Sequence, residues 1–271
     1  MLRSLVATQL GAERATAVVD GLVVHPSLLQ TAGDDVPRAV VAQALAIVLL
    51  DDLLRRVPAA AAYAEERWAD GDRLVLAHGA VHTVTGVASG ELAPGRESVA
   101  RVLRPLGYQP GPAGAWHHLD LPADIPRYLV DEVQADGFSE RFTAAAARVV
   151  RSSRDPLTGL AQVHLDRLAA DGHLPRPAAE SLVGELVGCF ARHHGPPTLD
   201  DYETVAAESD AMAWVATEGS TWHHAAVVVD DPVAAPPAPA TVERPFKVGE
   251  RATVVRTVPG SYLELVTVTA R

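Results

Sequence analysis

Apolar residues recur at helical spacing in the amino-terminal part of the chain. The run Ala39–Leu50 is apolar except for Gln43, and its larger residues recur at helical spacing: Val40, Val41, Ala44, Leu45, Val48 and Leu49. This spacing predicts a buried helix. Pro26 and Pro37 punctuate the sequence before it, so we expect residues 1–70 to form a series of helices.

The pattern becomes extended after residue 70. The stretch Arg73–Val87 is rich in valine and threonine and carries Gly79 in its middle, which favours a strand over a helix. A second extended piece covers Trp116–Leu121. Residues 71–133 are therefore interpreted as the first strands.

Helical spacing returns in the block 134–215. Breaks divide this block at Asp155–Pro156, Leu174–Pro175 and Gly195–Pro197. We interpret the block as a helical insertion between two groups of strands.

Closing strands are predicted at 216–271. The runs Ala225–Asp231, Ala252–Val258 and Ser261–Ala270 are rich in valine, the last two also contain threonine, and a short Pro/Ala linker at Ala235–Ala240 precedes these two. Strands before and after a helical insertion predict an α+β fold whose sheet is assembled from both ends of the chain.

The composition of residues 1–271 fits one α+β domain, with 48% hydrophobic and 21% charged residues. The formal net charge of −11 argues against a phosphate-backbone partner, so we expect no nucleic acid. No run reaches the roughly 18 apolar residues of a membrane span, and no secretory signal is visible. The single cysteine, Cys189, favours a reducing compartment. We expect a cytoplasmic protein without membrane contact, and the pattern favours neither a monomer nor an assembly.

Histidine is frequent, with 11 residues, which directs attention to metal or acid–base chemistry. His78 and His82 are four residues apart, but no glutamate follows the first one as in an HExxH helix. On a strand they face the same way, about 13 Å apart at about 3.3 Å per residue. They do not easily share one metal, so one can ligate while the other faces the substrate. Two histidines on a half-exposed strand face are the alternative.

His223, His224 and Glu264 are the other candidates. Adjacent strand residues point to opposite sides, so only one of the two histidines is expected to face a given interior, and the sequence does not choose which. Burying the Glu264 carboxylate unpaired costs several kcal/mol, so it must reach solvent, a cation or a metal. A core histidine and a water-facing glutamate on an edge strand are the alternatives. Two histidines and one carboxylate on separate strands form the set that holds non-haem Fe(II).

The remaining histidines carry weaker predictions. His117 and His118 follow Trp116 in the second extended piece, and one of them is expected to line the same cavity. His193 and His194 follow a predicted helix, where a cationic ring suits the carboxyl end.

Six ordered blocks occur over residues 70–268: AHGAVHTV around His78, LRPLGY, SSRDPLT, MAWVATEG with HHAA around His224, VERPF, and VPGSYLEL around Glu264. In this order they resemble the 2-oxoadipate dioxygenase/decarboxylase family. The resemblance implies a half-open β-barrel like that of vicinal oxygen chelate enzymes, with an amino-terminal helical segment and a helical insertion. It also implies that His78, His224 and Glu264 bind Fe(II). The implied reaction uses O₂ to convert a 2-oxo acid into a 2-hydroxy acid one carbon shorter and CO₂.

Two departures from the family pattern bear on the substrate. The family has an arginine four residues after its first metal histidine, where it holds a substrate carboxylate, and this chain has His82 there. The chain also ends seven residues after Glu264, earlier than typical longer members. We expect a less acidic or larger 2-oxo acid than 2-oxoadipate, with His82, His118 and Ser261 on the substrate side.

Two other functions agree with the same residues. An enzyme of the same fold could use the metal for isomerisation or hydrolysis without O₂, and anaerobic turnover would identify it. A non-catalytic descendant could keep the site as a metal-binding module.

Overall fold

The computed structural model describes residues 1–30, 33–230, 236–249 and 252–267. Its amino-terminal part is helical: α1 (Leu2–Leu10), α2 (Ala12–Asp20), α3 (Pro26–Gln30), α4 (Arg38–Arg56) and α5 (Pro58–Ala69). The predicted buried helix is confirmed as α4, whose residues from Ala39 to Asp51 are all buried. Among the described residues, no helix is both long and apolar enough to cross a bilayer.

A mixed sheet occupies the middle of the molecule. In the described part of the chain it has six strands in the order β10-β7-β2-β5-β4-β3. Their bounds are β2 (Val75–Thr85), β3 (Tyr108–Pro110), β4 (Ala115–His118), β5 (Arg127–Gln134), β7 (His224–Val228) and β10 (Tyr262–Val266). β10 runs parallel to β7, β7 antiparallel to β2, and β2 parallel to β5. The α+β class and a sheet built from both ends of the chain are thus confirmed.

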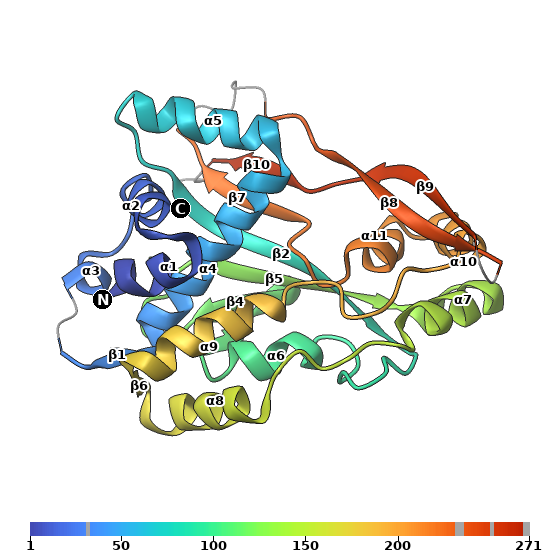
Figure 1. The fold of residues 1–271 in the computed structure, drawn as a ribbon, viewed down its shortest axis with the longest axis horizontal. Coiled ribbons are helices and arrows are strands. Elements are labelled where there is room, and N and C mark those ends of the chain that lie inside the picture. Colours follow the sequence, from blue (N-terminus) through green and yellow to red (C-terminus); the bar gives the residue numbers. More distant parts are fainter. Residues whose placement is uncertain (31–32, 231–235, 250–251, 268–271) are drawn as a thin grey trace.

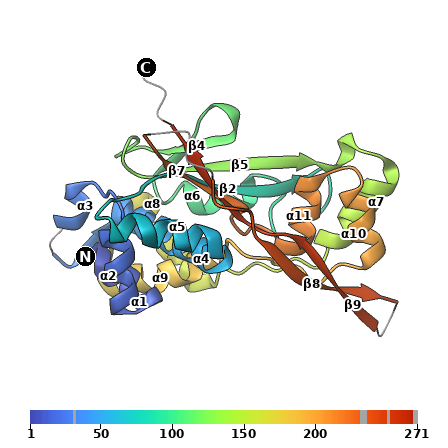
Figure 2. The same ribbon diagram turned by 90° about the horizontal axis from the view of Figure 1, so that it is seen from above.

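One face of this sheet packs on the main hydrophobic core. Val81, Tyr128, Val227 and Leu263 point into that core, which they share with the buried side of α4. Figure 2 shows α4, α5 and α9 on this side of the strands. Because strand residues alternate between faces, the residues next to these four lie on the opposite face, which carries the candidate site.

The helical insertion begins at α7 (Glu140–Val150) and continues as α8 (Gly159–Asp171), α9 (Arg176–Gly188), α10 (Leu199–Ala206) and α11 (Asp210–Glu218). The three predicted breaks fall between these helices. A short antiparallel pair, β1 (Asp35–Pro37) with β6 (His173–Pro175), joins α8 and α9 to the amino-terminal helices. Figure 1 shows α8 and α9 near the amino-terminal helices and α7, α10 and α11 at the other end of the sheet.

The far end of the site face is covered by α7, α10 and α11. Val84 and Val133 from the sheet pack there against Phe142, Met212 and Val215 in a second apolar cluster. The face is therefore closed at one end by the insertion and open where β2, β7 and β10 carry their polar residues.

A hairpin of β8 (Thr241–Val248) and β9 (Ala252–Pro259) leans on α10 and α11 (Figure 1). The Arg244 guanidinium donates from Nε and Nη2 to the two carboxylate oxygens of Glu218, both at 2.7 Å, and Phe246 packs on Tyr202 with ring centroids 4.6 Å apart. Residue 235 of the predicted linker lies outside the described residues, and 236–240 connect to β8 without regular structure.

Some elements were not predicted. α6 (Glu97–Leu103) is a helix inside the region expected to hold only strands, and β5 and β8 were not recognised as separate strands. β5 has only a short alternating stretch, and β8 contains a proline and charged residues, so neither has the valine-rich pattern that marked the other strands.

Candidate metal centre

Strand pairing brings the predicted ligands together. His78 lies opposite Ala226 of β7, and Glu264 of β10 lies opposite the same Ala226 from the other side. Directly opposite residues point to the same face of a sheet. The small Ala226 side chain therefore separates an imidazole and a carboxylate that lean towards each other, while His224 lies one row further along the same face.

A β-bulge sets the direction of His78. Leu76 pairs with Val227, but His78 pairs with Ala226, so Ala77 is an extra residue in β2. If β2 alternated regularly through Ala77, without the bulge, Leu76 and His78 would share one face, because strand residues two apart point the same way. With it, Leu76 joins the hydrophobic core and His78 faces the site.

Gly79 follows His78 in β2, on the side of the strand that packs against Trp222, where there is no room for a side chain. A Cβ atom at this position would lie 2.3 Å from ring atoms of Trp222, which is almost fully buried. Glycine inside a strand often marks such a close approach. The indole thus packs directly against the strand that carries the first histidine.

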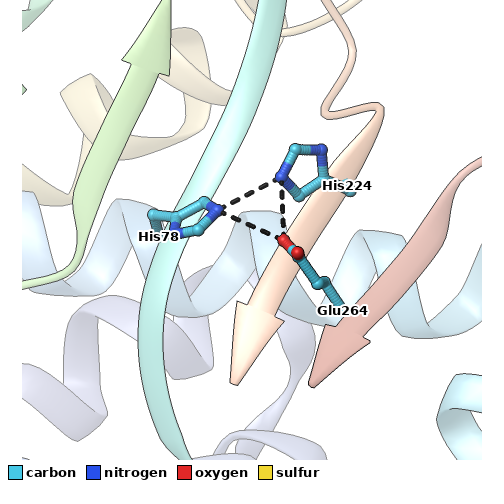
Figure 3. Close-up of side chains that lie close together, drawn as sticks. All are labelled: His78, His224 and Glu264. Atoms are coloured by element: carbon cyan, nitrogen blue, oxygen red, sulfur yellow. Dashed lines mark hydrogen bonds and ion pairs between the residues drawn. The ribbon is translucent and has the colours of Figure 1, made fainter. Parts of the chain in front are cut away.

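Three ligand atoms converge from three strands, as Figure 3 shows. The two Nε2 atoms of His78 and His224 lie 3.1 Å apart. The Oε2 atom of Glu264 lies 3.8 Å from Nε2 of His78 and 3.5 Å from Nε2 of His224. With bonds of about 2.1 Å, neighbouring ligand atoms around one ion lie about 3.0 Å apart in an octahedral site and about 3.4 Å apart in a tetrahedral one. The observed triangle therefore fits a single metal ion with little movement.

The electrostatics of the two histidines suit a metal. Burial lowers the pKa of both His78 and His224 to about 4, with a smaller contribution to His78 from His224 and the nearby Arg127. Both rings are therefore neutral at pH 7, with a lone pair available for a ligand bond. Their buried Nδ1 atoms have no hydrogen-bond partner within the described residues, and each can carry the proton while Nε2 binds a metal.

Glu264 lies on the edge strand β10, and its side chain is 45% exposed. The alternative expectation, a glutamate that faces water on an edge strand, is thus correct for part of this side chain. Its Oε2 atom nevertheless points at the two imidazoles rather than away from them (Figure 3). The open side of the carboxylate leaves access to the centre from solvent.

His82, His223 and Asp131 form a second polar group beside the first. The rings of His82 and His223 are stacked, with centroids 3.9 Å apart and planes 7° from parallel. The ligand atoms of this group also lie within 4.8 Å of one another, but parallel rings direct their lone pairs along parallel planes, which suits a shared ion less well than the T-shaped arrangement of His78 and His224. His78 and His82 thus belong to separate groups, as the strand spacing predicted.

The expectation that only one of His223 and His224 faces the site is wrong. Their ring centroids lie 4.5 Å apart, and both rings are on the site face. The alternation rule fails because β7 begins at His224, and His223 belongs to the bend before it.

His118 and Ser261 occupy different surroundings from His82. His118 is fully buried on β4, where its Nδ1 accepts from the backbone N–H groups of Asp120 and Leu121. The buried Ser261 hydroxyl donates to the Trp222 carbonyl at 2.9 Å and accepts from the Arg56 guanidinium. This serine links the segments that precede β7 and β10. The structure brings neither residue to the metal triangle.

A cavity of about 700 Å³ begins next to the triangle. Its described lining includes His82 and His223, Tyr262 at the start of β10, and Tyr202 and Trp214 from the helical insertion. Tyr262 also stacks on His224 with centroids 5.0 Å apart, which places the cavity beside the ligand set. Sequence reasoning missed Trp214, because only the tertiary fold brings α11 over the strands.

The fold and site define a mixed α+β protein with two histidines and one carboxylate that could hold a metal ion. The model of the family "2-oxoadipate dioxygenase/decarboxylase" matches residues 50–237. The chain belongs to this family of metal-dependent dioxygenases. A search of curated proteins found no match.

Solved structures agree with this assignment. A protein from Ralstonia eutropha JMP134, assigned to the glyoxalase superfamily, is 35% identical, has a TM-score of 0.92, and is matched over 98% of this chain and 94% of its own. Hydroxyglutarate synthases with bound 2-oxoadipate share the fold at lower identity. The Oryza sativa enzyme is 17% identical with a TM-score of 0.55, covering 88% of this chain and 84% of that one. The Pseudomonas putida enzyme is 17% identical with a TM-score of 0.52, covering 86% and 66%.

Proposed function

We propose that the protein is an Fe(II)-dependent dioxygenase that oxidatively decarboxylates a 2-oxo acid other than 2-oxoadipate. The observation that carries this proposal is the convergence of Nε2 of His78, Nε2 of His224 and Oε2 of Glu264. This ligand type suits non-haem Fe(II) enzymes, which need open positions beside three protein ligands. Family membership and the 2-oxoadipate bound to the hydroxyglutarate synthases support a 2-oxo acid as substrate.

The proposed reaction balances without a second organic substrate. R–CH₂–CO–COOH and O₂ give R–CH(OH)–COOH and CO₂, so both oxygen atoms enter the products. The carbon of the substrate carboxyl leaves as CO₂, the keto carbon becomes the new carboxyl, and the neighbouring carbon is hydroxylated. Bound iron supplies the electrons that activate O₂ and a positive charge that attracts the substrate carboxylate.

The protein's own residues prepare the site. The neutral rings of His78 and His224 and the one carboxylate of Glu264 leave a bound divalent cation with a net positive charge. Arg127 lies opposite His78 on β5 and adds a further positive charge near the same place. The net charge of the bound cation and the charge of Arg127 both favour binding of an anionic 2-oxo acid at the open side of Glu264. His82 lies beside this set, at the wall of the cavity.

We also propose that the curved sheet is a half-open barrel of the vicinal oxygen chelate type. The strand order β10-β7-β2-β5 places the ligand strands side by side, and the relative from Ralstonia eutropha, assigned to the glyoxalase superfamily, supports this.

An aerobic screen of 2-oxo acids tests the activity. The Fe(II)-loaded protein should consume one O₂ and release one CO₂ for each 2-hydroxy acid formed, and chelator-treated protein should do neither. Turnover under argon would contradict the proposal and favour an isomerase or hydrolase. Iron binding without turnover of any 2-oxo acid would favour a metal-binding module.

Removal of a ligand tests the site itself. His78→Ala and Glu264→Ala should lose bound iron while the far-ultraviolet circular dichroism remains that of the wild type. His164→Ala, on α8, is the matched control and should keep its iron. Full iron content in both ligand variants would refute the assignment.

A further inference from the structure

The cavity beside the metal site has the size of a small-molecule pocket. Its volume of about 700 Å³ falls within the range of about 300–1,000 Å³ that such pockets occupy. It lies between the helical insertion and the start of β10, and the hairpin supplies Pro259 to its wall. A ligand that fills this space contacts helices and strands together.

The cavity reaches the proposed position of the reacting group. Tyr262 is part of its wall and stacks on His224 with planes 18° apart. His223 also belongs to the wall and contacts the His224 ring, with centroids 4.5 Å apart. A 2-oxo acid with its carboxylate and keto oxygen at the metal triangle can therefore extend its side chain into the cavity.

The described wall is apolar and aromatic where that side chain would lie. Trp214, Tyr202 and Tyr262 provide rings, and Ala206, Ala213 and Pro259 provide small apolar surfaces. Aromatic walls bind a ligand ring through contact area and edge-to-face or offset stacking. Because Ala206 and Ala213 are small, they leave room in the cavity for a ligand side chain.

The charges around the cavity oppose a second carboxylate. No lysine or arginine belongs to its wall within the described residues, and the one fully charged group there is Asp210. Asp131 lies 4.0 Å from His82 Nδ1, which places another acid beside that ring. A distal carboxylate of a dicarboxylic 2-oxo acid would lose its hydration in a cavity whose described wall offers it an acid, Asp210, and no guanidinium or ammonium partner.

We infer that the substrate is a monocarboxylic 2-oxo acid with a bulky apolar or aromatic side chain, which lies against Trp214 and Tyr262 in this cavity. The inference rests on the proposed function, because it assumes that the 2-oxo acid group binds at His78, His224 and Glu264. It assigns the cavity wall, rather than the metal ligands, as the part that selects among 2-oxo acids.

Equilibrium binding tests this selectivity apart from turnover. Pyruvate, phenylpyruvate and 2-oxoadipate are titrated under argon into the Fe(II)-loaded protein, with calorimetry and quenching of tryptophan fluorescence as readouts. Phenylpyruvate should bind at least about tenfold more tightly than pyruvate or 2-oxoadipate, because it buries a ring in an apolar pocket. Equal or tighter binding of 2-oxoadipate would overturn the inference. If no 2-oxo acid binds, pyruvate included, the proposed function itself fails.

A cavity-filling variant locates the binding site of the side chain. Ala213→Phe places a ring in the cavity, and Ala207→Phe, at an exposed position after α10 that is not part of the described wall, is the matched control. The first should weaken phenylpyruvate binding by at least about tenfold and leave pyruvate binding unchanged. The control should bind both as the wild type does. Unchanged phenylpyruvate binding by a folded Ala213→Phe protein would place the side chain elsewhere and overturn the inference.

Discussion

Replacing Ala226 by leucine should abolish metal binding although no ligand is changed. Ala226 lies between His78 and Glu264 in the same row of the sheet, and it is fully buried. Because directly opposite residues point to the same face, a larger side chain at this position enters the space in which the ligand atoms converge.

The size of the effect follows from the strand spacing. Neighbouring strands lie about 4.8 Å apart, so the backbones of β2 and β10 are separated by about 10 Å, with β7 between them. The two side chains extend across most of this distance, so that Nε2 of His78 and Oε2 of Glu264 lie 3.8 Å apart. The leucine branch reaches about 2.5 Å beyond the alanine methyl, since each C–C bond is about 1.5 Å. An ion held about 2.1 Å from each ligand atom has no room to move away from that branch.

The assay compares Ala226→Leu with Ala226→Ser, which keeps a small side chain. Both proteins are loaded with Fe(II) under argon, desalted and analysed for iron per chain. The serine variant should also retain the stabilisation that metal gives, about 2.7 kcal/mol at a free metal concentration of 100 times Kd. The leucine variant should hold almost no iron and show no metal-dependent rise in Tm. Wild-type iron content in the leucine variant would refute the site geometry.

Three further substitutions test the surroundings of the site. Gly79→Ala places a Cβ 2.3 Å from a buried indole, so urea unfolding should show a loss of about 1–3 kcal/mol, and unchanged stability would contradict the close packing. Arg244→Ala leaves the Glu218 carboxylate buried without its partner and should cost about 2–3 kcal/mol, below a fully buried pair because Arg244 is partly exposed. Arg256→Ala, at an exposed position on β9, serves as its control and should match the wild type. His82→Ala should keep its iron but change 2-oxo acid affinity in an anaerobic titration. Loss of iron from that variant would instead assign His82 to the ligand set.

The candidate ligand set was predicted from residue types rather than from local patterns. His78, His224 and Glu264 come from strands that are far apart in the sequence, and each one alone has an ordinary structural explanation. Their combination indicated a metal site because two imidazoles and a carboxylate suit one kind of ion. The structure adds the distances that bring the three atoms to one place.

The cavity wall could not be predicted from local sequence. Trp214 belongs to a helix with an apolar pattern, and such a residue usually packs in a core. Its position beside His223, with ring centroids 6.1 Å apart, depends on how α11 packs over β2 and on the hairpin held by Arg244 and Glu218. These are contacts between distant segments, and a single sequence does not record them.

The bulge at Ala77 shows why strand periodicity alone was insufficient. Alternation places Leu76 and His78 on one face, which would turn either the leucine towards the candidate site or the histidine into the hydrophobic core. The extra residue resolves this conflict, because it lets Leu76 pair with Val227 in the core while His78 pairs with Ala226 at the site. Nothing in the amino-acid sequence around Ala77 marks it as the inserted residue. The bulge becomes necessary only once both neighbours have assigned faces, so its position follows from the tertiary structure, which places Leu76 in the core and His78 beside His224 and Glu264.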